Sequence, residues 1–176
     1  DYYQIPVADR QALIEEEGVD DLRQVPDALL NDRQLRVKHS TLTGKAYFDA
    51  EQAAAELAAH KLPAYFLDFE TILFAVPVWK GARPYQQIPF QFSCHTETAS
   101  GELLHAEYLS TDGSDPRRAL AEALIGTLLH DDARAGTIVA YNASFERGCV
   151  RGLAEPFPDL ATALRGIERR IVDLLP

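Results

Sequence analysis

The chain has 176 residues, of which 47% are hydrophobic and 25% are charged. It fits one ordinary globular domain with a short extension, and it is too long for a disulfide-stapled miniprotein. No run approaches the roughly 18 apolar residues of a membrane span, and the start lacks a basic region followed by an apolar signal core, so membrane insertion and secretion are not expected. The net charge of −10 argues against loose electrostatic adhesion to nucleic acid. It does not exclude a nuclease, because divalent cations held by carboxylates reverse the local field.

The first third of the chain has a helical pattern. A short helix is predicted to stop at Gly18, and further helical turns are broken at Pro26. Asp49 followed by Gln52 resembles a capping box before another helix. We therefore expect a helical lead-in over residues 1–62.

Residues 63–176 show a different periodicity, which predicts an α/β domain. The expected elements are strands over 64–72, 89–96 and 103–110, a helix through 128 that begins at Asp115-Pro116, a strand over 137–142, and helices over 144–155 and 160–170. Short links indicate that the first three strands are antiparallel neighbours, and a helical crossover leads to the next strand. This order predicts a ribonuclease H-like mixed sheet with an N-terminal helical extension.

Cysteine usage favours a reduced, cytoplasmic setting. Cys94 and Cys149 have no metal-ligand spacing and are too few for a disulfide framework. We expect both to be buried packing residues.

The chain begins at Asp1, contains no methionine and stops at Pro176 after an apolar run, which indicates a piece of a longer protein.

Asp68 and Glu70, in the first predicted strand, are the strongest chemical signal. Side chains two residues apart on a strand project to the same face, so the carboxylates share one patch while Leu67 and Phe69 point to the other side. A divalent cation between the carboxylates would relieve their repulsion and supply positive charge for phosphate chemistry. The alternative is a half-exposed strand with a wet acidic face, although Phe66 on that same face argues against it.

A second candidate stands where the strand predicted over 137–142 turns into a helix, the usual position for sites in α/β sheets. Glu146 would add a third carboxylate to the first two. The ordinary alternatives are that Asn142 caps the helix and that Glu146 is a solvated first-turn acid favoured by the helix dipole.

The loop after the first strand combines aromatic rings and cations. Trp79, Arg83 and Tyr85 are candidates to stack a base or pair a phosphate, and the alternative is a packed lid. Among the five histidines, His95 or His105 could approach the acidic patch if the sheet order allows it.

Two motifs resemble those of a known superfamily. Asp68-Phe69-Glu70-Thr71 resembles the first motif, aspartate-x-glutamate-threonine, of the DnaQ-like (DEDD) 3′-to-5′ exonucleases, and the NASFE string over 142–146 resembles their second, asparagine-x-x-phenylalanine-aspartate. The strings YFLDFET, RPYQQIPFQFS, TIVAYNASFE and RIVDLLP are similar to an uncharacterised bacterial domain-of-unknown-function family, often found after a RecB-like nuclease region. This likeness covers about residues 60–176.

The resemblance implies a ribonuclease H-like nuclease domain over residues 63–176 that cleaves nucleic acid with two Mg²⁺ or Mn²⁺ ions, roughly 3.5 to 4 Å apart. In that scheme Asp68 and Glu70 hold the cations and Glu146 completes the cluster. Asn142 and Asp173 are accessory candidates. The implied partners are DNA or RNA and a RecB-like nuclease region of the same full-length chain.

The sequence departs from the superfamily pattern at two points. Glu146 stands where aspartate is usual, so its carboxylate lies about one bond length further out. The third motif, a His or Tyr four residues before a last aspartate, is expected beyond Pro176, and with it the general base. We therefore expect weak metal binding and little or no catalysis from this chain alone.

Two other interpretations stay open. The first is a degenerate, non-catalytic nuclease fold that binds nucleic acid or a protein partner, with Asp68 and Glu70 as remnants. The second is a purely structural interaction domain, which the acidic balance and the helical first third favour.

Overall fold

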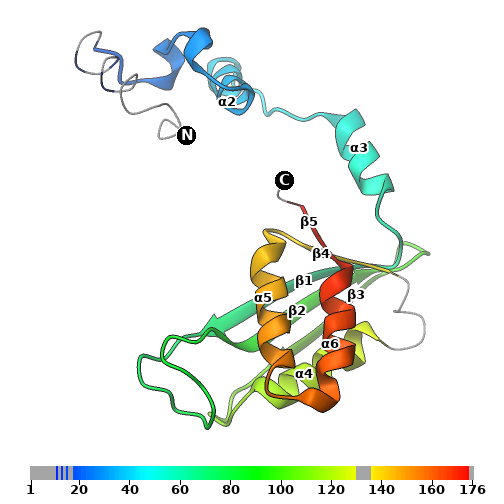
Figure 1. The fold of residues 1–176 in the computed structure, drawn as a ribbon. Helices are drawn as coiled ribbons and strands as arrows, with labels where there is room; N and C mark the ends of the chain where they lie inside the picture. The colour runs from blue at the N-terminus through cyan, green and yellow to red at the C-terminus, as the bar shows by residue number, and fades with distance from the viewer. Residues whose placement is uncertain (1–10, 12, 14, 16–17, 130–135, 175–176) are drawn as a thin grey trace. The chain divides into compact units, whose positions relative to one another are not determined.

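A computed structural model describes residues 18–129 and 136–174, together with residues 11, 13 and 15 (Figure 1). The chain divides into two compact units, Asp1–Ala55 and Glu56–Pro176, and the division falls within helix α3 (Ala50–Ala58). Asp49 caps this helix as its spacing predicts, because its Oδ1 accepts a hydrogen bond from the Gln52 N–H at 2.9 Å. The helix predicted before Gly18 lies largely outside the described residues.

The first unit contains a helix that the sequence pattern did not predict. Two 3₁₀ helices, η2 (Leu22–Gln24) and η3 (Asp27–Leu29), confirm the short turns around Pro26, and α2 (Asp32–Thr43) follows them. A complete capping box starts α2: Asn31 Oδ1 accepts from the Gln34 N–H, and Gln34 Oε1 accepts from the Asn31 N–H, both at 2.9 Å. The helix ends at Gly44, whose φ of +66° is the left-handed conformation that glycine adopts readily.

The second unit is built on a five-stranded mixed sheet with the order β3-β2-β1-β4-β5. Its strands are β1 (Ala64–Ile72), β2 (Ile88–Glu97), β3 (Leu103–Leu109), β4 (Thr137–Ala140) and β5 (Ile171–Asp173). The first three strands pair antiparallel, and β1, β4 and β5 pair parallel. Helix α4 (Arg117–Leu128) forms the crossover to β4. The predicted α/β class, antiparallel strands and crossover are therefore confirmed, whereas the three-residue β5 was not predicted.

One face of the sheet is covered by α4, α5 (Ala143–Ala154) and α6 (Pro158–Arg170) (Figure 1). Tyr65, Leu67 and Phe69 of β1 point into this layer and are each 3% exposed. Leu120 of α4 and Val150 of α5 are fully buried beside them. This layer is the main core of the unit. Among the described helices, none is long and apolar enough to cross a membrane.

The two cysteines are buried and free, as predicted. Burial raises the pKa of the Cys94 thiol to about 11 and that of the Cys149 thiol to about 12. Both thiols are therefore protonated near neutral pH and serve as small packing groups.

Asp115 and Pro116 stand at the start of α4, where the sequence places a cap and a proline. Pro116 is the N-cap residue. Asp115 Oδ1 accepts a hydrogen bond from the N–H of Arg117, the first residue of the helix, at 3.1 Å. The same carboxylate pairs with the buried Arg117 guanidinium, Nη2 to Oδ2, at 2.6 Å, so it holds both the backbone and the side chain of the first helical residue.

Position 136, just before β4, has to be glycine because the backbone of Pro63 lies too close to leave room for a side chain. A Cβ at this position would collide with the Pro63 carbonyl oxygen and lie 2.8 Å from Tyr65 Cε2. We expect Gly136→Ala to lower the free energy of unfolding by about 1 to 3 kcal/mol, because the backbone has to shift. The matched control is Gly152→Ala inside α5, where a Cβ meets open space; it should stabilise the fold by about 0.5 to 1 kcal/mol. Urea unfolding measures both, and equal effects would contradict the prediction.

Candidate functional site

Asp68 and Glu70 project from the face of β1 that is opposite the helix layer. Leu67 and Phe69 alternate with them and lie in the core, whereas both carboxylates are exposed. The shared face predicted for the pair is therefore confirmed. Phe66 on the same face is 38% exposed, so this face is accessible to solvent.

The turn from β4 into α5 brings a further carboxylate close. The strand ends at Ala140, two residues earlier than predicted, and Asn142 has a φ of +64°. Its side chain makes no capping hydrogen bond; Asn142 Oδ1 accepts from the Ser144 hydroxyl at 2.9 Å. The Asn142 N–H donates to Oδ1 of Asp173, the last residue of β5, at 3.0 Å. Asn142 and Asp173 thus fix the backbone immediately before α5. The prediction that the Asn142 side chain caps this helix is wrong.

Glu146 is a buried carboxylate rather than a solvated first-turn acid. It is 3% exposed, and its Oε2 has no hydrogen-bond partner among the described residues. Burial is the main cause that raises the pKa of this carboxyl above its ordinary value, and the negative charges of Asp68 and Asp173 raise it further. Asp68 and Asp173 therefore lie within electrostatic reach of Glu146.

The three predicted ligands do not form one closed cluster. Asp68 and Glu70 lie exposed on β1, whereas Glu146 lies buried in the first turn of α5. Over the described ranges, no group of three or more His, Cys, Asp or Glu side chains is close enough to hold a metal ion. The single pocket of three carboxylates expected from the sequence is therefore not assembled in this structure. The donor chemistry of Glu146 nevertheless suits a cation, because a buried carboxylate oxygen without a donor is costly.

A hollow of about 470 Å³ borders Asp68 on the exposed face. Ser93 and His95 of β2 and Tyr141, after β4, line the same hollow. His95 therefore reaches the surroundings of Asp68, as the sheet order allows. Its ring stacks on that of His105 with centroids 4.4 Å apart, so the two imidazoles support each other.

The three loop residues predicted to bind substrate differ in their surroundings. The Trp79 ring packs edge to face on Phe74 with centroids 5.4 Å apart, which matches the packed-lid alternative for this residue. Arg83 Nη2 lies 3.6 Å from Glu155 Oε2, and both side chains are largely exposed. Tyr85 is 70% exposed. A substrate-binding role for the three residues stays a prediction, with Arg83 and Tyr85 accessible to a ligand.

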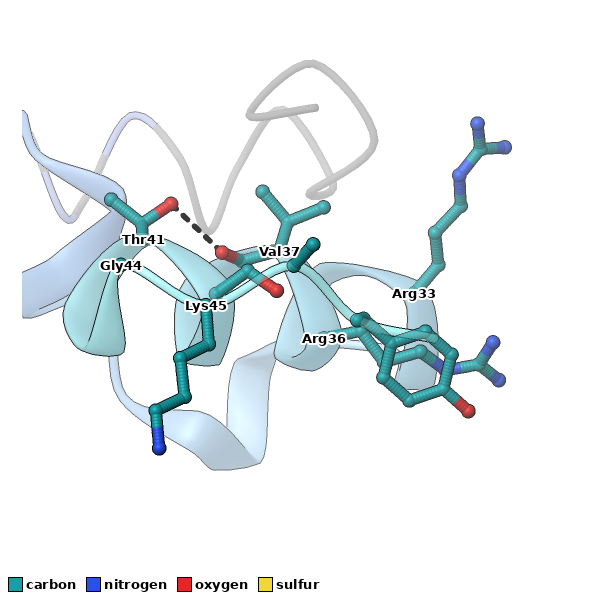
Figure 2. A pocket seen from close by; sticks show the side chains of 9 residues that line it. Arg33, Arg36, Val37, Thr41, Gly44 and Lys45 are labelled. Carbon is teal, nitrogen blue, oxygen red and sulfur yellow. Dashed lines mark hydrogen bonds between the residues drawn. The ribbon is translucent and has the colours of Figure 1, made fainter. Parts of the chain in front are cut away.

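A basic and aromatic pocket that the sequence pattern did not predict lies in the first unit. Arg33, Arg36, Lys45 and Tyr47 line a hollow of about 680 Å³, and Arg36 Cζ lies 5.0 Å from the Tyr47 ring centroid. Figure 2 shows Arg33 and Arg36 at one side of the pocket, while Lys45 extends away from them. Because the three cations do not converge, this pocket is not a compact anion site.

Comparison with known families decides where the second unit belongs. A family model described as Domain of unknown function (DUF2779) matches residues 65–176, which is more than half of the chain. The chain belongs to this family. No curated protein and no solved structure matches it. The predicted likeness to an uncharacterised family is thus confirmed.

The DUF2779 region contains every carboxylate of the candidate site. Asp68 and Glu70 lie near its start, Glu146 in its second half, and Asp173 near its end. The basic pocket of the first unit lies outside it.

Proposed function

We propose that the DUF2779 domain is a divalent-metal-dependent nuclease of ribonuclease H-like architecture and DnaQ-like ancestry, which hydrolyses phosphodiester bonds in nucleic acid. The DFET and NASFE strings support this proposal by their order and composition. The strand order, with three antiparallel strands followed by a crossover to the strand β4, which pairs parallel with the central strand β1, supports it independently.

Glu146 is the single observation that carries the proposal. Its carboxylate is buried, one of its oxygens has no hydrogen-bond partner among the described residues, and two further carboxylates add to its charge repulsion. Purely structural positions avoid this combination, because each of these features is unfavourable for folding. A divalent cation offsets all three penalties at once.

In the proposed site, Asp68, Glu70 and Glu146 would hold one or two Mg²⁺ or Mn²⁺ ions. Such ions neutralise charge on the phosphate and lower the pKa of a bound water. Asp173 holds the Asn142 N–H at 3.0 Å, so it fixes the turn that positions α5 and its glutamate. Asp173 and Asn142 thus have a positioning role.

Calorimetric titration with Mn²⁺ tests the proposal. We expect wild-type protein to show a saturable heat and Asp68→Ala to lose at least tenfold in affinity, because each carboxylate ligand contributes strongly to a hard cation site. The matched control is Asp112→Ala, which removes an exposed aspartate that bonds only to Ser114 among the described residues. Identical isotherms for wild type and Asp68→Ala would refute the metal site.

A non-catalytic nucleic-acid-binding module is the second candidate. The absence of an assembled group of metal-ligating side chains within the described ranges favours it. This alternative predicts that a gel shift with an oligonucleotide is the same in EDTA and in Mn²⁺, and that the protein shows no Mn²⁺ heat sensitive to Asp68→Ala.

A further inference from the structure

The helices α5 and α6 together form a pocket rich in arginine. Arg147 and Arg151 lie one helical turn apart on α5, and Arg165 and Arg169 lie one turn apart on α6, so each pair shares a helix face. The two helices lie side by side (Figure 1). All four side chains line one hollow of about 460 Å³, and Glu168 is the only acidic residue among those lining it.

The charge of this pocket is mostly uncompensated. Arg151 is neutralised by Glu168, with Nη2 and Oε1 2.6 Å apart. Within the described part of the chain, Arg147, Arg165 and Arg169 have no carboxylate within ion-pair distance. Three positive charges therefore remain in one hollow of a chain whose net charge is −10.

The helix dipole does not explain this arrangement. Basic residues stabilise the C-terminal end of a helix, and this accounts for Arg169 in the last turn of α6. Arg147, however, lies near the start of α5, where the dipole is positive and a cation is unfavourable. Arg165 lies in the middle of α6, beyond the reach of the dipole. Guanidinium groups gathered at such positions favour an anion between them.

We propose that this arginine pocket binds a backbone phosphate of a nucleic acid, an inference that rests on the proposed nuclease function and extends it to substrate binding. Guanidinium groups bind phosphate oxygens in a bidentate fork, which suits a phosphodiester better than a single-point cation does. The pocket and the candidate carboxylates share a helix, because Arg147 of the pocket follows Glu146 on α5. Arg147 Nη2 also donates to the Ile171 carbonyl at 2.5 Å, two residues before Asp173.

Fluorescence anisotropy with a labelled single-stranded oligonucleotide tests the pocket. In EDTA and at low salt, the double variant Arg165→Ala/Arg169→Ala should bind at least tenfold more weakly than wild type. The slope of log K against log salt should fall by about 0.7 for each phosphate that the variant no longer neutralises. The matched control is Arg23→Ala/Arg118→Ala, which removes the same charge at arginines that already pair with Asp21 and Asp159. It should bind within twofold of wild type.

Several outcomes separate this pocket from the metal site. Loss of oligonucleotide binding in Arg165→Ala/Arg169→Ala with an unchanged Mn²⁺ isotherm supports the pocket as a distinct anion site. The same loss in a protein that binds no Mn²⁺ supports the pocket and refutes the nuclease proposal. Equal affinities and salt slopes for the double variant and its control would overturn the pocket. Binding of a polyglutamate as tight as that of the oligonucleotide would overturn its assignment to nucleic acid.

Discussion

Glu146→Gln is expected to stabilise the metal-free protein. In EDTA near neutral pH, we expect the free energy of unfolding to rise by about 1 to 3 kcal/mol, because the change removes a buried charge, one oxygen of which has no hydrogen-bond donor in the part of the chain that the structure describes. Urea unfolding measures this gain. Most substitutions at a buried position destabilise, so a gain here would be specific evidence for a costly carboxylate.

The stabilisation should depend on pH with a defined sign. The pKa of Glu146 is raised in the folded protein, first by burial and then by Asp68 and Asp173. The folded state therefore keeps the proton at a pH where the unfolded chain has lost it. The free energy of unfolding of wild type should fall as the pH rises from the pKa of Glu146 in the unfolded chain to its higher pKa in the folded protein. Above the folded-state pKa it should stay low. Wild type and Glu146→Gln should converge at pH values below the unfolded pKa.

The matched control for this experiment is Glu102→Gln, at an exposed glutamate in the turn between β2 and β3. It should change the free energy of unfolding by less than about 0.5 kcal/mol at any pH. Mn²⁺ should raise the melting temperature of wild type and should affect Glu146→Gln much less, because a bound ligand stabilises only the state that holds it. A destabilised Glu146→Gln protein at neutral pH would contradict the account.

Arg170→Ala is expected to destabilise the second unit strongly. The Arg170 guanidinium donates to the Gly136 carbonyl at 3.0 and 3.1 Å and to the Leu128 carbonyl at 2.9 Å, and so joins α6 to the end of α4 and the start of β4. Its Cζ also lies 5.8 Å from the Tyr65 ring centroid. Removal of these charged hydrogen bonds leaves carbonyl groups unpaired, at an expected cost on the order of 3 kcal/mol.

Two further variants isolate the guanidinium of Arg170. Arg169→Ala, at the exposed neighbouring position, should cost less than about 0.5 kcal/mol. Arg170→Lys should recover only part of the loss, because an ammonium group lacks the planar fork that reaches two carbonyls. Equal unfolding free energies for Arg169→Ala and Arg170→Ala would show that these hydrogen bonds contribute nothing.

The strands of the second unit could be predicted because their signals are local. Alternation over Leu67, Asp68 and Phe69 fixes which side chains face the core, and the structure has this alternation.

Helix α2 was not predicted, although the spacing of Asn31 and Gln34 is typical of a capping box. A helix of such polar sequence lacks the apolar stripe that indicates α3.

The burial of Glu146 could not be predicted from its sequence position. A glutamate in the first turn of a helix is ordinarily solvated, and only the packing of α5 on the sheet decides otherwise. The arginine pocket was not predicted for a related reason. Each pair has an evident spacing of four residues, but the pocket depends on two helices lying side by side, which no local pattern encodes.

The most direct test of the central claim is to locate bound Mn²⁺ by the paramagnetic broadening of amide signals. We expect selective broadening around Asp68 and Glu70 in β1 and around Asn142 to Glu146 at the start of α5, with α4 unaffected. Broadening should vanish from both regions in Asp68→Ala. Uniform weak broadening, or broadening centred on any other acidic surface, would contradict the proposed metal site.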